Sequence, residues 1–132
     1  MKAELQEKLF TEHQILYQDK HKGPKVTLMC FGFDCGDGWF DILMGLSSKI
    51  EEYNRKNPES PVVATQVKSK FGELRFYIYG GDEHIYKLIN AATRKSRKTC
   101  ELCGSTSQVP QNKEGWIETL CPSCRTKYST MK

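Results

Sequence analysis

Apolar and polar residues alternate most regularly between residues 62 and 79, which read VVATQVKSKFGELRFYIY. Period-two alternation places successive side chains on opposite faces of a strand. The second arm divides into two faces: Leu74, Phe76 and Ile78 against Arg75, Tyr77 and Tyr79. The first arm divides into Val63, Thr65 and Val67 against Val62, Ala64, Gln66 and Lys68. Because Gly72 can adopt a positive φ, residues 69–73 suit a chain reversal, and the pattern predicts a β-hairpin.

The flanking segments show the wider spacing of apolar residues that is typical of helices. Helices are predicted over residues 3–17, 39–56 and 83–97. Asp82 is predicted to cap the N-terminus of the third helix, and Asp37 is predicted to be the N-cap or a first-turn carboxylate of the second. The run Val26–Phe33 is apolar on both faces and predicts a strand that lies centrally beside the hairpin. The order α-β-α-β-β-α predicts an α+β fold, a small antiparallel or mixed sheet covered by helices in two layers.

Length and composition indicate one modest domain with a small appendage, a body of residues 1–98 and a C-terminal segment of residues 99–132. Of 132 residues, 38% are hydrophobic and 27% are charged, which suits a globular protein with a thin core. There is no apolar run of about 18 residues and no signal-peptide pattern, so a membrane partner is excluded and a cytoplasmic location is predicted.

Four of the six cysteines form two C-x-x-C pairs, Cys100 with Cys103 and Cys121 with Cys124, and 17 residues lie between the pairs. This spacing fits the C-x₂-C-x₁₅₋₂₀-C-x₂-C zinc template. Four thiolates form a closed tetrahedral shell, so the metal would be structural Zn²⁺, with iron as the alternative. The sequence predicts a zinc ribbon with a small hairpin between the knuckles, and Trp116 is expected to pack against the body or the knuckles.

Charge is unevenly distributed along the chain. Residues 1–93 carry 12 basic and 13 acidic side chains, whereas residues 94–132 carry 8 and 3. The polar face of the hairpin interleaves cations with tyrosines, which is the combination that binds phosphates and stacks on bases. The alternative is an ordinary solvated face. The candidate ligand-binding residues are Lys68, Lys70, Arg75, Tyr77, Tyr79, Arg94 and Trp39.

The glycine-rich stretch Gly32–Gly38 precedes a predicted helix, the position of many phosphate-binding loops, but it lacks the GxxxxGK[ST] and GxGxxG motifs. A structural turn is the better interpretation, and a divalent cation bound by Asp34 and Asp37 is the alternative. Cys30 and Cys35 are predicted to be buried structural thiols or to approach one another. No catalytic set of residues is evident, so no catalytic residue is predicted.

Three segments resemble one known family: CGDGWF at Cys35–Phe40, QVKSKFGELRFY at Gln66–Tyr77, and CELCG…GW…TLC from Cys100 to Cys121. The chain is similar, over about residues 30–124, to small uncharacterised proteins of bacteria and tailed phages. That family has no established activity and therefore supplies no active-site residues. The resemblance implies a phage or prophage origin, and such phage proteins often act on the host without being enzymes, some by sequestering nucleotide immune signals.

The leading hypothesis is a non-enzymatic binding protein with a structural zinc, whose ligand is a nucleotide or nucleic acid and which counteracts host defence. The first alternative is a protein–protein adaptor that docks on a host complex through the zinc ribbon. The second is a divalent-metal nuclease or hydrolase that uses Asp34 and Asp37. A homo-oligomer is compatible with each of these hypotheses.

Overall fold

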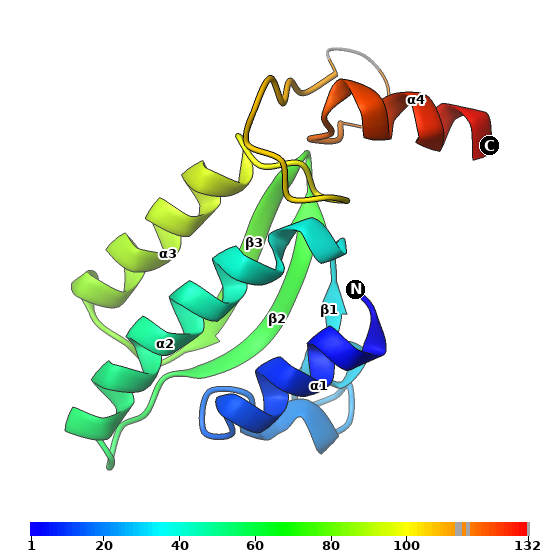
Figure 1. Cartoon of the computed structure of the whole chain (residues 1–132). Helices are drawn as coiled ribbons and strands as arrows, with labels where there is room; N and C mark the ends of the chain where they lie inside the picture. Colours follow the sequence, from blue (N-terminus) through cyan, green and yellow to red (C-terminus); the bar gives the residue numbers. More distant parts are fainter. Residues whose placement is uncertain (113–114, 116, 132) are drawn as a thin grey trace.

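The computed structural model describes residues 1–112, 115 and 117–131 and is a mixed α+β structure (Figure 1). Its three-stranded sheet has the order β1-β2-β3, formed by β1 (Phe33–Asp34), β2 (Val63–Lys70) and β3 (Glu73–Tyr79). Strand β1 runs parallel to β2, and β2 and β3 are antiparallel. The helices are α1 (Ala3–Glu12), α2 (Phe40–Lys56), α3 (Glu83–Ser96) and α4 (Pro122–Met131). The predicted fold class is therefore confirmed.

Helices α2 and α3 lie side by side over one face of β2 and β3 (Figure 1). The apolar side chains of the hairpin point into the space between the sheet and these helices, where Val67 and Leu74 are fully buried with Leu43 and Ile50 of α2. Burial of each such side chain contributes roughly 1.5–3 kcal/mol. Among the described residues, no helix combines the length and the hydropathy that a membrane span requires.

The hairpin turn contains two residues, Phe71 and Gly72, and both have positive φ, 55° and 75°. This conformation is that of a type I′ turn, which matches the twist of antiparallel strands. The predicted alternation of the first arm is wrong beyond Ala64, because the register shifts between Ala64 and Gln66. A β-bulge adds one residue at this point and reverses the alternation, so that Ala64 and Val67 both face the core.

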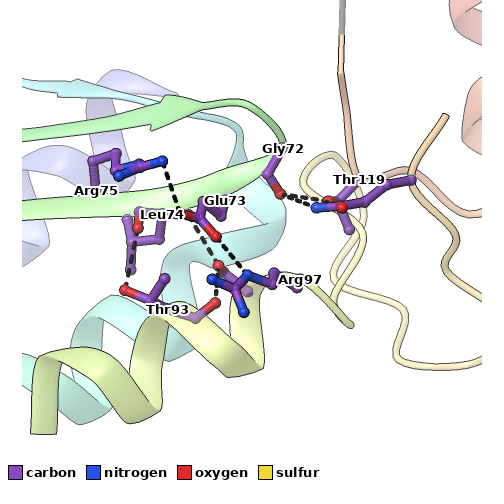
Figure 2. Close-up of polar contacts among 9 residues, drawn as sticks. Gly72, Glu73, Leu74, Arg75, Thr93, Arg97 and Thr119 are labelled. Atoms are coloured by element: carbon purple, nitrogen blue, oxygen red, sulfur yellow. Dashed lines mark hydrogen bonds and ion pairs between the residues drawn. The ribbon is translucent and has the colours of Figure 1, made fainter. Parts of the chain in front are cut away.

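The edge of β3 is closed by side chains of α3. The backbone N–H of Leu74 donates to Ser96 Oγ at 2.9 Å, and Thr93 Oγ1 donates to the carbonyl of Leu74 at 3.2 Å (Figure 2). These bonds satisfy the main-chain groups of Leu74 that point away from β2. At the other end of α3, Asp82 is the predicted N-cap, and its carboxylate accepts from the N–H of Ile85 at 3.1 Å.

The prediction of a strand over residues 26–33 is wrong. Only Phe33 and Asp34 pair with β2, and they lie at the edge of the sheet rather than at its centre. Residues 29–31 form a 3₁₀ turn instead, in which Met29 is buried while Phe31 is 69% exposed. An apolar run alone does not distinguish a strand from a succession of turns that sends only some of its residues inward.

The first helix is shorter than predicted. It ends at Glu12, and residues 13–17 continue as turns that still bury Leu16 and Tyr17. Asp37 is not the N-cap of α2, whose N-cap residue is Trp39. The Asp37 carboxylate instead accepts a hydrogen bond from the backbone N–H of Lys2 at 2.7 Å, because residues 37–39 form a 3₁₀ turn that redirects the chain before α2 begins.

Candidate functional site

The four predicted metal ligands come together at one point in the C-terminal segment. The sulfur atoms of Cys100, Cys103, Cys121 and Cys124 all lie within 4.8 Å of one another. The Sγ atoms of Cys103 and Cys121 are 3.7 Å apart, close to the sulfur–sulfur distance of about 3.8 Å that a tetrahedral ion with Zn–S bonds near 2.3 Å requires. These cysteines could therefore hold a metal ion.

Local hydrogen bonds shape each C-x-x-C pair. In the first pair, the N–H of Cys100 donates to Ser105 O and the N–H of Gly104 donates to Cys100 O, so the chain closes into a tight knuckle. The second pair opens α4, and the N–H of Cys124 points at Cys121 Sγ, 3.4 Å away. Free amides at a helix N-terminus favour a thiolate in this position.

The environments of the four thiols differ. Burial opposes ionisation of Cys100, but hydrogen bonds with the backbone at Cys121, Cys103 and Leu102 outweigh it and lower the pKa of this thiol to about 7. Burial and hydrogen bonds with the other three thiols raise the pKa of Cys124 to about 12. A bound metal would favour the thiolate form of all four cysteines, because its positive charge stabilises the anions.

Residues 99–131, here called the cysteine module, are bound to the body through the first knuckle. The N–H of Gly38 donates to the carbonyl of Glu101 at 2.7 Å, and the N–H of Gly36 donates to the Glu101 carboxylate at 2.9 Å. Ser69 of β2 donates to the other carboxylate oxygen at 2.9 Å. Burial raises the pKa of Glu101 even though these hydrogen bonds lower it. A single residue beside a metal ligand therefore joins two separate parts of the body.

The tip of the hairpin makes a second connection to the cysteine module. The carbonyl of Gly72 accepts from Gln111 Nε2 at 3.0 Å and also from Thr119 Oγ1 (Figure 2). Gln111 and Thr119 form the bridge between the two halves of the module, and the carbonyl of Thr119 accepts from the N–H of Glu101 at 2.9 Å. These contacts and those of Glu101 are together called the seam.

Two expectations about tryptophans have different outcomes. Trp39 was a candidate ligand-binding residue, but its side chain is fully buried, and Nε1 donates to the carbonyl of Thr99 at 3.0 Å. The indole is thus a core residue that also contacts the module, and it cannot reach a ligand. Trp116 lies outside the described residues.

The outer face of the hairpin, which carries Gln66, Lys68, Arg75, Tyr77 and Tyr79, is the face turned away from α2 and α3. The side chains of Tyr77 and Tyr79 are 42% and 76% exposed. In the antiparallel register, Gln66 pairs with Tyr77, and Lys68 pairs with Arg75 in the next row. Among the described residues, Lys68 has no carboxylate within ion-pair distance. The structure thus brings together the polar residues of both arms.

Arg75 is not a free cation. Its guanidinium forms an ion pair with Glu73 at 2.8 Å, and the same carboxylate also pairs with Arg97, the C-cap residue of α3 (Figure 2). One acid therefore bridges two arginines around the edge of β3, and the group retains one net positive charge.

Arg94 lies on the exposed surface of α3 and is not joined to the outer face by any contact among the described residues. Lys70 lies at the hairpin tip, and its Nζ atom is 5.4 Å from the centroid of the Phe71 ring.

A groove borders the outer face and was not foreseen from the sequence. It has a volume of about 310 Å³ and is lined by residues 24–28 together with Thr65, Gln66 and Tyr77. The loop is held there because the N–H of Leu28 donates to the carbonyl of Thr65 at 2.9 Å. Val26 and Leu28 remain 65% and 40% exposed along its wall. The apolar run that suggested a strand was the available signal, but only tertiary structure shows where it lies.

The loop that carries Asp34 and Asp37 has no carboxylate metal site. Asp37 is held by Lys2, through the backbone bond and an ion pair at 3.9 Å. Within the part of the chain that the structure describes, the four cysteines are the one group of potential ligands that could hold a metal. Cys30 and Cys35 are both free thiols, and Cys35 is buried.

Comparison with family models, curated proteins and solved structures finds no match to this chain.

Proposed function

We propose that this protein is a zinc-stabilised, non-enzymatic binding protein whose outer hairpin face binds a phosphate-bearing ligand. The metal is Zn²⁺, because four thiolates at tetrahedral spacing form its preferred closed structural site. The observation that carries the ligand proposal is the outer face itself. Two solvent-exposed tyrosines, Tyr77 and Tyr79, share this face with Lys68, which forms no ion pair with any described residue.

The zinc assignment is tested by elemental analysis of the purified protein, with one zinc per chain as the expected content. The Cys121→Ser variant removes one ligand and should lose most of the zinc. Cys30→Ser is the matched control, because Cys30 lies outside the cluster and its Sγ faces the carbonyl of Thr27. Iron in place of zinc, or equal metal content in both variants, would contradict the assignment.

The ligand proposal is tested by calorimetric titration with pyrophosphate, ATP and a short oligonucleotide. Lys68→Ala combined with Tyr77→Ala should weaken binding of whichever probe binds by about tenfold or more. The control pair is Lys87→Ala with Tyr86→Ala on α3, since Tyr86 is 50% exposed and so resembles Tyr77. Equal affinities of the two double variants, or no binding of any probe, would overturn the proposal.

A second candidate, a protein–protein adaptor, is favoured by two exposed apolar side chains near the module. Phe71 at the hairpin tip is 61% exposed, and Leu102 on the first knuckle is 43% exposed. A protein partner that resists nuclease treatment and is lost from the Phe71→Ser and Leu102→Ser variants would support the adaptor. A partner retained by both variants would exclude docking through this surface.

A further inference from the structure

We infer, on the basis of the proposed function, that the phosphate-bearing ligand is single-stranded nucleic acid, and that one of its bases enters the groove beside Tyr77. The groove and the outer face are continuous, because Tyr77 and Gln66 belong to both. The inference therefore concerns one surface with two parts, a slot for a base and a track for the backbone.

The side chains that line the groove suit the face of a base. Tyr77 supplies an aromatic ring, and Val26 and Leu28 supply exposed apolar surface from the loop. Bases that are not stacked on one another stack on such side chains in sequence-tolerant binding. A volume of about 310 Å³ is large enough for one base.

The groove also has a polar side chain that suits the edge of a base. Gln66 lines it and pairs across the sheet with Tyr77. Its carboxamide offers both donors and an acceptor, and it makes no hydrogen bond to any other described residue. An amide in this position can donate to and accept from the edge of a base, whereas a purely apolar ligand would leave it without a partner.

A second stacking position points to a chain rather than a mononucleotide. Tyr79 follows Tyr77 on the same face of β3, about 6.6 Å further along the strand. Its side chain is 76% exposed. A mononucleotide would engage one tyrosine, whereas consecutive bases of an extended strand would engage both.

The charges beside these rings give the backbone its track. Lys25 stands at the rim of the groove, and Lys68 occupies the row next to Gln66 and Tyr77. Two acids also lie beside the track: Asp34 pairs in register with Lys68, and Glu73 follows the turn. The two arginines Arg75 and Arg97 pair with Glu73. Because Lys25 and Lys68 outnumber the one remaining carboxylate, the face keeps an excess of positive charge. A polyanion is the complementary ligand.

A duplex does not fit this arrangement, because its bases are stacked and paired and their faces cannot reach Tyr77. A tyrosine on the surface of a β-sheet stacks only on a base that is already unpaired. The expected order of affinity is therefore single strand first, with duplex and mononucleotide below it.

The test is fluorescence anisotropy with a labelled oligonucleotide of about 8 nucleotides, a length within the range that small single-strand binding folds occupy. The single strand, as DNA or RNA, should bind about tenfold or more tightly than its duplex or a mononucleotide. Tyr77→Ala should weaken single-strand binding about 5- to 150-fold, with Tyr86→Ala unchanged. Val26→Glu should also weaken it, whereas Ile15→Glu, at an exposed position outside the groove, should not.

The salt dependence of binding separates phosphate contacts made by Lys68 from base stacking on Tyr77. Each phosphate contact contributes about −0.7 to the slope of log K against log salt for single strands, so Lys68→Ala should reduce the slope by about 0.7. Tyr77→Ala should leave the slope unchanged. Duplex affinity equal to that of the single strand, or an unaltered affinity in Tyr77→Ala, would overturn this inference. Tyr77-dependent binding of a mononucleotide as tight as that of the oligonucleotide would overturn it while the proposed function stands, and absence of all binding would overturn both.

Discussion

The body and the cysteine module are stabilised by different means. In the body, nineteen described hydrophobic side chains form one buried cluster that spans the sheet and its helices. Among the described residues of the module, the buried cluster contains three, Cys100, Leu120 and Cys121, and two of these are candidate metal ligands. The body can therefore fold by hydrophobic burial, whereas we expect the module to need the proposed metal and the seam.

Removal of metal should give the largest effect. Structural zinc sites contribute about 10–16 kcal/mol of apparent binding free energy, which the small core of the module cannot replace. We expect a chelator to abolish hydrogen-exchange protection in the described residues beyond Thr99 and to leave α2, α3 and the hairpin protected. Protection of the module that survives in metal-free protein would show that the seam alone maintains its fold.

The next largest effect is expected at the seam. A Cβ on Gly38 would lie 2.6 Å from the backbone N of Gly104 and would also clash with the carbonyl of Cys100. Because backbone atoms cannot rotate away, Gly38→Ala should reduce the free energy of unfolding by about 3 kcal/mol. Denaturant titration of the metal-loaded protein measures this change.

Gly45→Ala is the matched control, since a Cβ on Gly45 in α2 has no atom within 4 Å. Alanine is the better helix former, so this variant should be stabilised by about 1 kcal/mol. Equal behaviour of the two alanine variants would mean that the first knuckle does not pack against residues 36–38 in solution.

A smaller effect is expected within the body. Ser96→Ala leaves the buried N–H of Leu74 without its acceptor and should reduce the free energy of unfolding by about 1–3 kcal/mol. The loss should be the same with and without metal, because this contact belongs to the body. Ser48→Ala, at an exposed position of α2, is the control and should have little effect. A loss that appears only in metal-loaded protein would contradict the independence of the two regions.

The smallest effect is expected in the alkylation of Cys35, which should not react in the folded protein. Burial, followed by the nearby Glu101 carboxylate, raises the pKa of Cys35 to about 12, so at neutral and mildly alkaline pH it stays a protonated thiol. Because the thiolate is the nucleophile, Cys35 should resist iodoacetamide in folded, metal-loaded protein. The partly exposed Cys30 should react first, as peptide mass spectrometry would show. Modification of Cys35 at the same rate as Cys30 would indicate that the body opens readily.

Sequence periodicity predicted the elements that repeat a simple pattern. The arm Leu74–Tyr79 and helix α3 follow their expected faces, and the spacing of the four cysteines predicted their convergence. The bulge near Thr65 reverses the first arm, and no local pattern indicates an inserted residue. The apolar run Val26–Phe33 predicts a strand wrongly, because apolar residues also occur in turns and their number alone does not show whether the chain is extended. The sequence does not predict the contact between Gly38 and Glu101, because both residues form it through backbone atoms that every residue type shares.

The seam also sets an order of events during synthesis on the ribosome. The residues on the body side of the seam, including Gly38 and Gly72, are made first, and their partners Glu101 and Thr119 emerge later. Chains fold from the N-terminal side as they lengthen, so the body can complete its apolar core before the last two cysteines are available. With the proposed zinc site, metal capture would be the final step, and a cell short of metal would accumulate folded bodies with an unfolded tail that proteases can trim.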